Sequence, residues 1–171
     1  STTQSMKIIY KMMQYPLANT LVIRRVFNTH KDSTWTQLKW AANNLGVSHL
    51  WKFSKSPLEA TYIPTGQKIL FRGLDDPMSI TSITVEIGYL CWCWFEEAFQ
   101  MTNEDDFNKV DMSIRGELPP GYFKQITLTF NPWSEKIWIK KRFFDVEDDN
   151  VLALTSTYKC NEFLGDDDIE I

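Results

Sequence analysis

The sequence predicts an α/β fold, with a mostly parallel sheet flanked by helices, and three observations support this. Residues 19–27 and 88–95 are almost continuously apolar, as strands buried on both faces of a parallel sheet are. Segments with apolar residues three or four positions apart, typical of helices, stand between the strands. The 171-residue chain is 43% hydrophobic and 23% charged, which is the ordinary composition of a globular domain with a core. Alternating strands and helices favour parallel pairing, because a helix carries the chain back between parallel strands.

The first half of the chain supplies two helices, a strand and a hairpin. In order, these are a helix at 2–16, a strand at 19–27, a helix at 29–46 and a hairpin at 58–73. The first helix has Thr2 or Thr3 near its N-cap and ends at Pro16, and the second ends at Gly46. The hairpin alternates apolar and polar residues and turns at residues 64–66, where proline and glycine stand.

The second half repeats the alternation of strand and helix. In order, we expect a strand at 88–95, a helix at 103–116, a strand at 123–132, a helix at 134–144 and a strand at 150–158. The helix at 103–116 has acidic residues in its first turn, and Ser134 is the expected cap of the next helix. The acidic tail, residues 161–171, shows little pattern. Because we find no internal repeat and no linker, residues 1–171 are predicted to form one domain.

Composition excludes several classes of protein. The net charge of −4 gives no global basic field, and no apolar run reaches the roughly 20 residues that span a bilayer. No signal peptide opens the chain. Cys91 and Cys93 alternate along an apolar run, so together with Cys160 we interpret them as small buried hydrophobes in a reducing cytosol. The two histidines have no zinc-like spacing to these cysteines.

Polar residues gather where the predicted strands end. Glu96 and Glu97 follow the strand at 88–95, and Asn131 ends the strand at 123–132. Ser1 and Thr2 open a helix, whose N-terminal N–H groups favour anions. Ligands in parallel sheets bind beyond the carboxyl ends of the strands. These residue types match the needs of a nucleoside triphosphatase: one carboxylate for magnesium, one for the attacking water, and an amide that senses the γ-phosphate.

A simpler interpretation of the same residues stays open. Paired glutamates after a strand are also typical of a helix start, and Asn131-Pro132 is typical of an ordinary turn. The glycine-rich phosphate loop that ends in Gly-Lys-Ser or Gly-Lys-Thr is not found in the sequence. Such a loop is followed by a helix that begins with Ser or Thr, as this chain does. We therefore expect the loop to lie immediately upstream of Ser1.

Longer stretches carry a family resemblance. "PTGQKILFRGLDDP", "FEEA" and "LTFNPWSEK" are its specific parts. They resemble the ATPase domain of the large terminase subunit of tailed bacteriophages and prophages, most closely the branch found in Gram-positive bacteria and defective prophages. The resemblance implies a P-loop NTPase core of the ASCE type that lacks its first strand and Walker A loop and carries an inserted β-hairpin. It also implies an N-terminally incomplete domain without the family's nuclease domain.

The resemblance assigns roles to individual residues. Glu97 takes the position of the catalytic glutamate, and Glu96 and Ser1 those of the magnesium ligands. The residues implied to contact the nucleotide are Ser1, Thr2, Arg24, Arg25 and Asn131. Many members carry an arginine that acts in trans shortly before this strand. Here residues 78–88 contain none, so Arg72 and Arg115 are the candidates. Hydrolysis by these 171 residues should be impaired, because the glycines and lysine of Walker A are missing.

The resemblance also implies a function and partners. ATP and Mg²⁺ would drive double-stranded DNA, bound without sequence preference, into the procapsid. The implied partners are the portal protein, the small terminase subunit and further copies of the full-length chain in a ring. The implied location is the host bacterial cytoplasm, transiently at the procapsid portal. The candidate contacts to DNA phosphates are Lys31, Lys52, Lys55, Lys140, Lys141 and Arg142.

Two other functions remain open. The chain could be a catalytically inactive prophage remnant, or an assembly module that keeps the fold. It could also be a metal-dependent nuclease that uses Glu96, Glu97 and the aspartates at 166–168, although these fall in different parts of the pattern.

Overall fold

The computed structural model describes residues 1–114, 116–132 and 137–157, and the chain divides into two compact units. The second unit, Glu135–Ile171, contains α5 (Trp138–Phe143). The first, Ser1–Ser134, contains the sheet and the remaining elements. Its helices are α1 (Thr2–Gln14), α2 (Thr34–Asn44), α3 (Pro77–Thr81) and α4 (Glu104–Ser113), with 3-10 turns η1 (Phe27–His30), η2 (Ser48–Leu50) and η3 (Ala98–Gln100). Its strands are β1 (Ala18–Arg24), β2 (Trp51–Lys55), β3 (Leu58–Tyr62), β4 (Gln67–Gly73), β5 (Tyr89–Glu96) and β6 (Gln125–Thr129).

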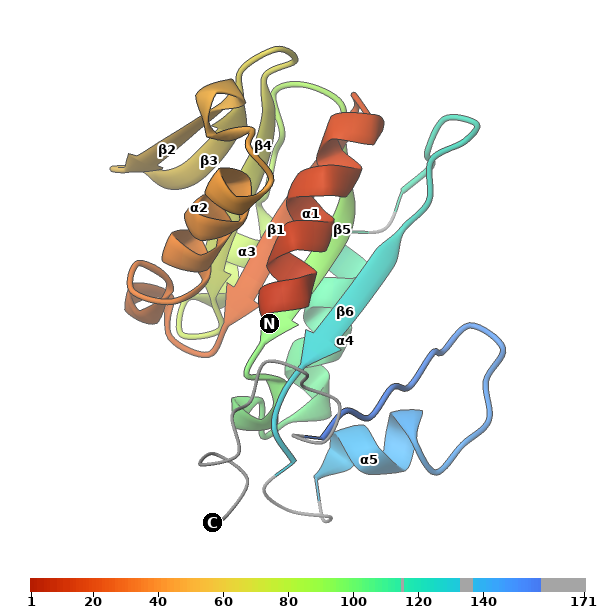
Figure 1. The fold of residues 1–171 in the computed structure, drawn as a ribbon. Helices are drawn as coiled ribbons and strands as arrows, with labels where there is room; N and C mark the ends of the chain where they lie inside the picture. Colours follow the sequence, from red (N-terminus) through yellow and green to blue (C-terminus); the bar gives the residue numbers. More distant parts are fainter. Residues whose placement is uncertain (115, 133–136, 158–171) are drawn as a thin grey trace. The chain divides into compact units, whose positions relative to one another are not determined.

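The six strands form one sheet in the order β2-β3-β4-β1-β5-β6 (Figure 1). β1 pairs in parallel with β4 and with β5, and β5 pairs in parallel with β6. β3 pairs antiparallel with both β2 and β4. The predicted mostly parallel α/β sheet is therefore confirmed, and the hairpin is added to one side of it.

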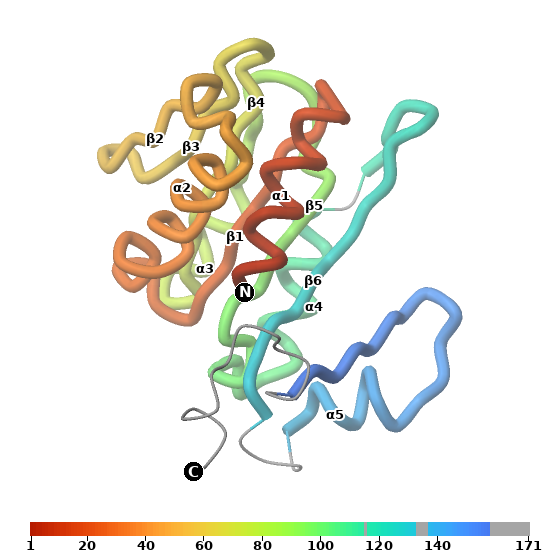
Figure 2. The backbone as a smooth tube through the Cα atoms, in the orientation of Figure 1, coloured from red at the N-terminus to blue at the C-terminus, as the bar shows by residue number. Residues whose placement is uncertain are grey.

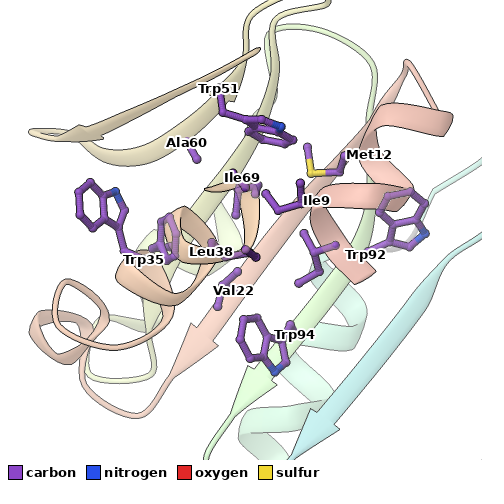
Figure 3. Packing of buried hydrophobic residues seen from close by; sticks show 14 of the residues in the cluster. Ile9, Met12, Val22, Trp35, Leu38, Trp51, Ala60, Ile69, Trp92 and Trp94 are labelled. Carbon is purple, nitrogen blue, oxygen red and sulfur yellow. The ribbon is translucent and has the colours of Figure 1, made fainter. Parts of the chain in front are cut away.

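Helices cover both faces of the sheet. α1 and α2 lie side by side on one face, and α3 and α4 lie on the other (Figures 1 and 2). β1 is buried along its whole length, as its apolar sequence predicts. Ile9 and Met12 of α1 and Leu38 of α2 pack against Val22 and Trp94 in the cluster between the helices and the sheet (Figure 3).

The structure agrees with most of the expected elements and adds two. The turn at 64–66 is present, and Gly66 adopts a φ of +80°, which glycine accepts without strain. β2 was not predicted, although Trp51 and Phe53 alternate with polar residues as strands do. α3 was not predicted either, although an aspartate precedes its N-terminal Pro77, a usual helix start.

One predicted strand is wrong. The described part of the segment predicted at 150–158, residues 150–157, contains no strand, and Leu152 and Leu154 are 82% and 79% exposed. Apolar residues alone do not make a strand, which also needs a neighbour to pair with its N–H and C=O groups. Ser134, the expected cap of the helix that forms α5, lies outside the described residues. The single-domain prediction stays a prediction.

Among the described residues, no helix is long and apolar enough to cross a membrane. Cys91 and Cys93 are buried free thiols, and burial raises the pKa of each. Both therefore behave as the small hydrophobic residues that their alternation in β5 predicts. Cys160 lies outside the described residues.

Candidate active site

The carboxyl ends of β1, β5 and β6 meet at one edge of the sheet. The strands are parallel, and Glu96, the last residue of β5, stands opposite Thr129, the last residue of β6. The N-terminus of α1 lies at this edge (Figure 1). The Ser1 end of this helix is among the groups whose charge acts on Glu96, although burial is the largest influence and raises the pKa of that carboxyl. The two acids, the end of β6 and the tip of α1 therefore lie at one edge of the sheet.

Arg24, the last residue of β1, contacts both acids. Its Nη2 donates to Glu97 Oε2 at 2.5 Å, and its Nε lies 3.3 Å from Glu96 Oε2. The side chains of Arg24 and Glu96 are only 9% and 13% exposed, whereas that of Glu97 is 40% exposed. Adjacent carboxylates repel each other, and one guanidinium offsets this repulsion for both.

A second set of contacts orients this trio. Arg24 Nη1 donates to the backbone oxygen of Thr29 at 3.1 Å and to Ser33 Oγ at 2.5 Å. Gln100 Nε2 donates to Glu97 Oε2 at 2.9 Å. The guanidinium is thus fixed from the η1 segment and the start of α2, and Glu97 from η3. These residues hold the acids at defined positions.

The backbone of Glu97 is left-handed, with φ +52° and ψ +47°. Among the described residues, Glu97 is the only non-glycine residue with positive φ. The conformation costs about 1 kcal/mol for an L-residue and is concentrated at functional sites. It turns the chain sharply after β5, so that the side chains of two consecutive acids both reach Arg24.

The surroundings of Glu96 shift its pKa. Burial raises the pKa of Glu96, and neighbouring Glu97 raises it further, while Arg24 and the Ser1 amino group act in the opposite direction. The buried Oε2 of Glu96 lies against Arg24 without a hydrogen-bond donor aligned to it. That orphan oxygen suits a metal ion or its bound water. No group of three or more His, Cys, Asp or Glu side chains among the described residues could hold a metal.

β6 contributes a hydroxyl at the same edge. Thr129 shares the face of Glu96, and its Oγ1 accepts a hydrogen bond of 2.7 Å from Trp94 Nε1. Asn131 follows two residues later, exposed to solvent. Among the described residues it forms no hydrogen bond to Glu96 or Glu97. The backbone therefore brings Asn131 to the predicted edge but does not place its side chain on the acids.

Hydroxyl groups at the tip of α1 face α2. Gln37 Nε2 donates to Thr2 Oγ1 at 3.1 Å and to Ser1 Oγ at 3.4 Å. An open hollow of about 430 Å³ lies beside them, lined by Thr2, Ser33, Thr36, Gln37 and Trp40. Neither Glu96 nor Glu97 lines it, but Ser33 connects it to Arg24. The tip of α1 is thus a polar, open surface next to the acids.

The remaining predicted arginines lie elsewhere. Arg25 is exposed, so it does not share the buried position of Arg24. Arg72 lies on the opposite face of the sheet, where its Nε donates to the backbone oxygen of Ser79 in α3 at 3.2 Å. Burial lowers the pKa of Arg72, while Glu59 and Asp76 raise it. Arg115 lies outside the described residues.

Sequence reasoning missed the residues that fix Arg24 and Glu97. Gln100 stands three residues after Glu97, a spacing that lets side chains meet across one turn and could have indicated the contact. Ser33 is a typical helix N-cap residue, and such a residue is expected to bond to the helix backbone and not to Arg24. Its contact with Arg24 depends on how η1 folds back, which the local sequence does not encode.

Comparisons with known proteins identify relatives of this chain. A family model described as "Phage terminase large subunit" matches residues 1–171. The chain is 42% identical over 168 residues to "Terminase, large subunit" of Bacillus phage SPP1, covering 96% of this chain and 40% of that protein. It is 28% identical over 140 residues to "PBSX phage terminase large subunit" of Bacillus subtilis (strain 168), covering 82% of this chain and 30% of that protein.

A solved structure supports the fold. The large terminase of a thermophilic bacteriophage matches with a TM-score of 0.61 at 16% identity, covering 82% of this chain and 33% of that one. The chain thus spans less than half the length of the relatives that it matches. Both sequence relatives come from Bacillus or a Bacillus phage, in agreement with the Gram-positive branch that the sequence resembles. The chain belongs to the phage terminase large subunit family.

Proposed function

We propose that this chain supplies the ATP-hydrolysing part of a DNA-packaging motor, with Glu97 as its catalytic residue. One observation carries the proposal: Arg24 holds two consecutive acids at the carboxyl ends of parallel strands, beside the tip of α1. A general base must be held within reach of water, and Glu97 is both positioned and 40% exposed. Glu96, at 13% exposure, is better suited to a cation than to bulk water.

Each residue has a part in this proposal. Glu96 and the Ser1 hydroxyl are the proposed protein ligands of Mg²⁺, which when bound neutralises charge on the β- and γ-phosphates of ATP. Glu97 orients the attacking water and accepts its proton. Arg24 keeps both carboxylates in place, and Thr2 and Asn131 are the proposed contacts to phosphate oxygens. Arg25 and the trans-acting candidates Arg72 and Arg115 remain proposals without a contact that supports them.

The wider role follows from the family. We propose that hydrolysis drives double-stranded DNA, held through its backbone without sequence preference, into a procapsid. The proposed partners are the portal protein, the small terminase subunit and other copies of the full-length chain in a ring. The proposed place of action is the host bacterial cytoplasm, at the procapsid portal during packaging. The names of the relatives, which are terminase large subunits, support this role.

A chimera tests the proposal in a protein of full length. Residues 1–171 replace the matching part of the SPP1 large subunit, to which the chain is 42% identical, and the parental protein sets the reference rate. The measurement is magnesium-dependent release of phosphate from ATP. The substitution Glu97→Gln should lower kcat roughly 100-fold or more, because it removes the proposed base but keeps the size of the side chain.

Glu86→Gln is the matched control. Glu86 is an exposed glutamate just before β5, at the other end of the strand, and its loss should leave kcat within about twofold. Equal rates for the Glu97→Gln and unmodified chimeras would exclude Glu97 as the base. A folded chimera that hydrolyses no ATP, beside an active parental protein, would favour the alternative of an inactive remnant or assembly module.

A further inference from the structure

Charge is divided unevenly along the sequence. Residues 1–58 contain eight lysines and arginines and a single acidic residue, Asp32. Residues 59–171 contain ten basic and twenty-one acidic residues. The net charge of −4 therefore conceals a basic first third of the chain. α1, α2 and β2, which all lie within residues 1–58, contain no acidic residue.

The fold collects much of this positive charge in one layer. α1 and α2 lie side by side on the same face of the sheet (Figure 1). Lys7 on α1 and Lys39 on α2 are exposed, and Lys55 is exposed at the end of β2. Lys11, one turn after Lys7, is partly exposed and is fixed by a 2.9 Å hydrogen bond to Gln125. We call these four lysines, Lys7, Lys11, Lys39 and Lys55, the basic layer.

Trp35 lies beside two lysines of the basic layer. The Nζ atoms of Lys39 and Lys55 each lie 5.5 Å from the centre of the Trp35 ring. The indole itself is 5% exposed and donates a 3.0 Å hydrogen bond to the backbone oxygen of Ser54. α2 and β2 are thus joined at this point, and two like charges are held against one rigid ring. No carboxylate pairs with either lysine among the described residues.

Uncharged donors lie between the two helices. The open hollow of about 430 Å³ is lined by Thr2, Ser33, Thr36, Gln37 and Trp40, and Trp40 is 43% exposed. Hydroxyl and amide groups are common partners of DNA phosphates and sugars, alongside lysine. The layer therefore combines positive charge with neutral donors and an exposed aromatic ring.

We propose that the basic layer, on the face of the sheet that α1 and α2 cover, is the surface through which this chain contacts the phosphate backbone of double-stranded DNA. The inference rests on the proposed packaging function for the identity of the polyanion. The choice of this surface rests on the positive charge of its lysines, which is complementary to the negative charge of DNA phosphates.

The structure distinguishes two lysines that the sequence alone gives equal weight as candidate DNA contacts. Lys52 and Lys55 lie three residues apart in β2 and therefore on opposite faces of the sheet. Lys55 reaches Trp35 on the α2 face, whereas Lys52 pairs in register with Thr61 on the other face. Only Lys55 belongs to the basic layer. The two residues provide a comparison within one strand.

The experiment measures binding of the 171-residue chain to a fluorescent random-sequence duplex by anisotropy, over a series of salt concentrations. The double substitution Lys39→Gln/Lys55→Gln removes two charges from the basic layer. It should weaken binding at least fivefold and reduce the slope of log K against log[salt] by about 1.8, since each phosphate contact contributes about 0.9. The control Lys52→Gln/Lys109→Gln removes two charges from the opposite face and α4 and should change affinity less than twofold.

Each other outcome overturns the proposal. Equal losses in the two double variants would mean that only net charge matters. If the unmodified chain does not bind the duplex at low salt, the basic layer is not a DNA-binding surface. If poly-glutamate displaces the labelled duplex as well as unlabelled duplex does at equal charge, the basic layer is a site for acidic proteins instead. The ATPase assay of the chimera without DNA separates the two hypotheses. Lys39→Gln/Lys55→Gln should leave that rate unchanged. The DNA-binding hypothesis can therefore be excluded while the proposed role of Glu97 stands, and the role of Glu97 can be excluded while the DNA-binding hypothesis stands.

Discussion

A single arginine, Arg24, offsets the negative charge of the two acids at the end of β5. Arg24→Ala would leave Glu96, which is 13% exposed, beside Glu97 without a cation, and removing one partner of a buried pair costs about 3 kcal/mol. We expect the free energy of unfolding, measured by urea denaturation at pH 7, to fall by about that amount. Its neighbour Arg25 is exposed, so Arg25→Ala should change stability by less than about 0.5 kcal/mol. A similar loss in both variants would show that the pairing of Arg24 with the acids does not stabilise the fold.

At the scale of elements, Lys11 joins α1 to the strands beneath it. Its Nζ lies 4.2 Å from the centre of the Trp92 ring and 4.7 Å from that of Phe123, and it donates to Gln125 at the start of β6. Tyr15, one turn further along, packs edge-on against the rings of Trp92, Tyr122 and Phe123. This contact holds the far end of α1, while its tip lies at the acids.

The titration of Lys11 reports this packing. Burial, followed by the charge of Lys7, lowers its pKa from the ordinary 10.5 to about 8, while Cys91 acts in the opposite direction. An NMR titration of the lysine side chains should give a midpoint about 8 for Lys11, and Lys7→Gln should raise that midpoint. The control Lys52→Gln, on the other face of the sheet, should leave it unchanged. A midpoint of 10.5 would mean that Lys11 is fully solvated and that α1 is not held in this way.

At the scale of the whole molecule, a buried histidine makes stability depend on pH. His30 is fully buried, with Nδ1 2.7 Å from Thr34 Oγ1 and Nε2 2.7 Å from the backbone oxygen of Arg72. It therefore joins η1, α2 and β4. Burial lowers its pKa from 6.5 to about 4, with the charge of Arg24 acting in the same direction and the Arg72 oxygen and Asp75 against it. The unfolded chain thus binds the proton more tightly than the folded chain does.

The stabilisation from neutral His30 is fully present above pH 6.5 and is lost as the pH falls toward 4. The loss should be about 3 kcal/mol, the shift converted at about 1.4 kcal/mol per pKa unit. Urea denaturation between pH 7 and pH 4.5 measures it. His30→Gln should flatten this part of the profile relative to the unmodified chain, whereas His49→Gln, at an exposed position, should not. Parallel profiles for the unmodified chain and His30→Gln would exclude His30 as the cause.

The sequence by itself determined the α/β class, the helices α1, α2 and α4 and the strands β1, β5 and β6, because each carries its own apolar period or buried run. It also determined that Glu96 and Glu97 end a strand, since adjacent charges after an apolar run mark where burial stops. Apolar character alone misled at residues 150–157, because a strand needs a pairing partner that is not written in its own residues.

Only the tertiary structure decided which residues meet. Arg24 and Glu97 are 73 residues apart, and they touch because β1 and β5 are neighbours in the sheet and Glu97 turns left-handed. The separation of Arg72 from Arg24, and of Lys52 from Lys55, depends on which face of the sheet each side chain occupies. Strand order and facing are set by packing of the whole chain, whereas local sequence encodes only the period of each element.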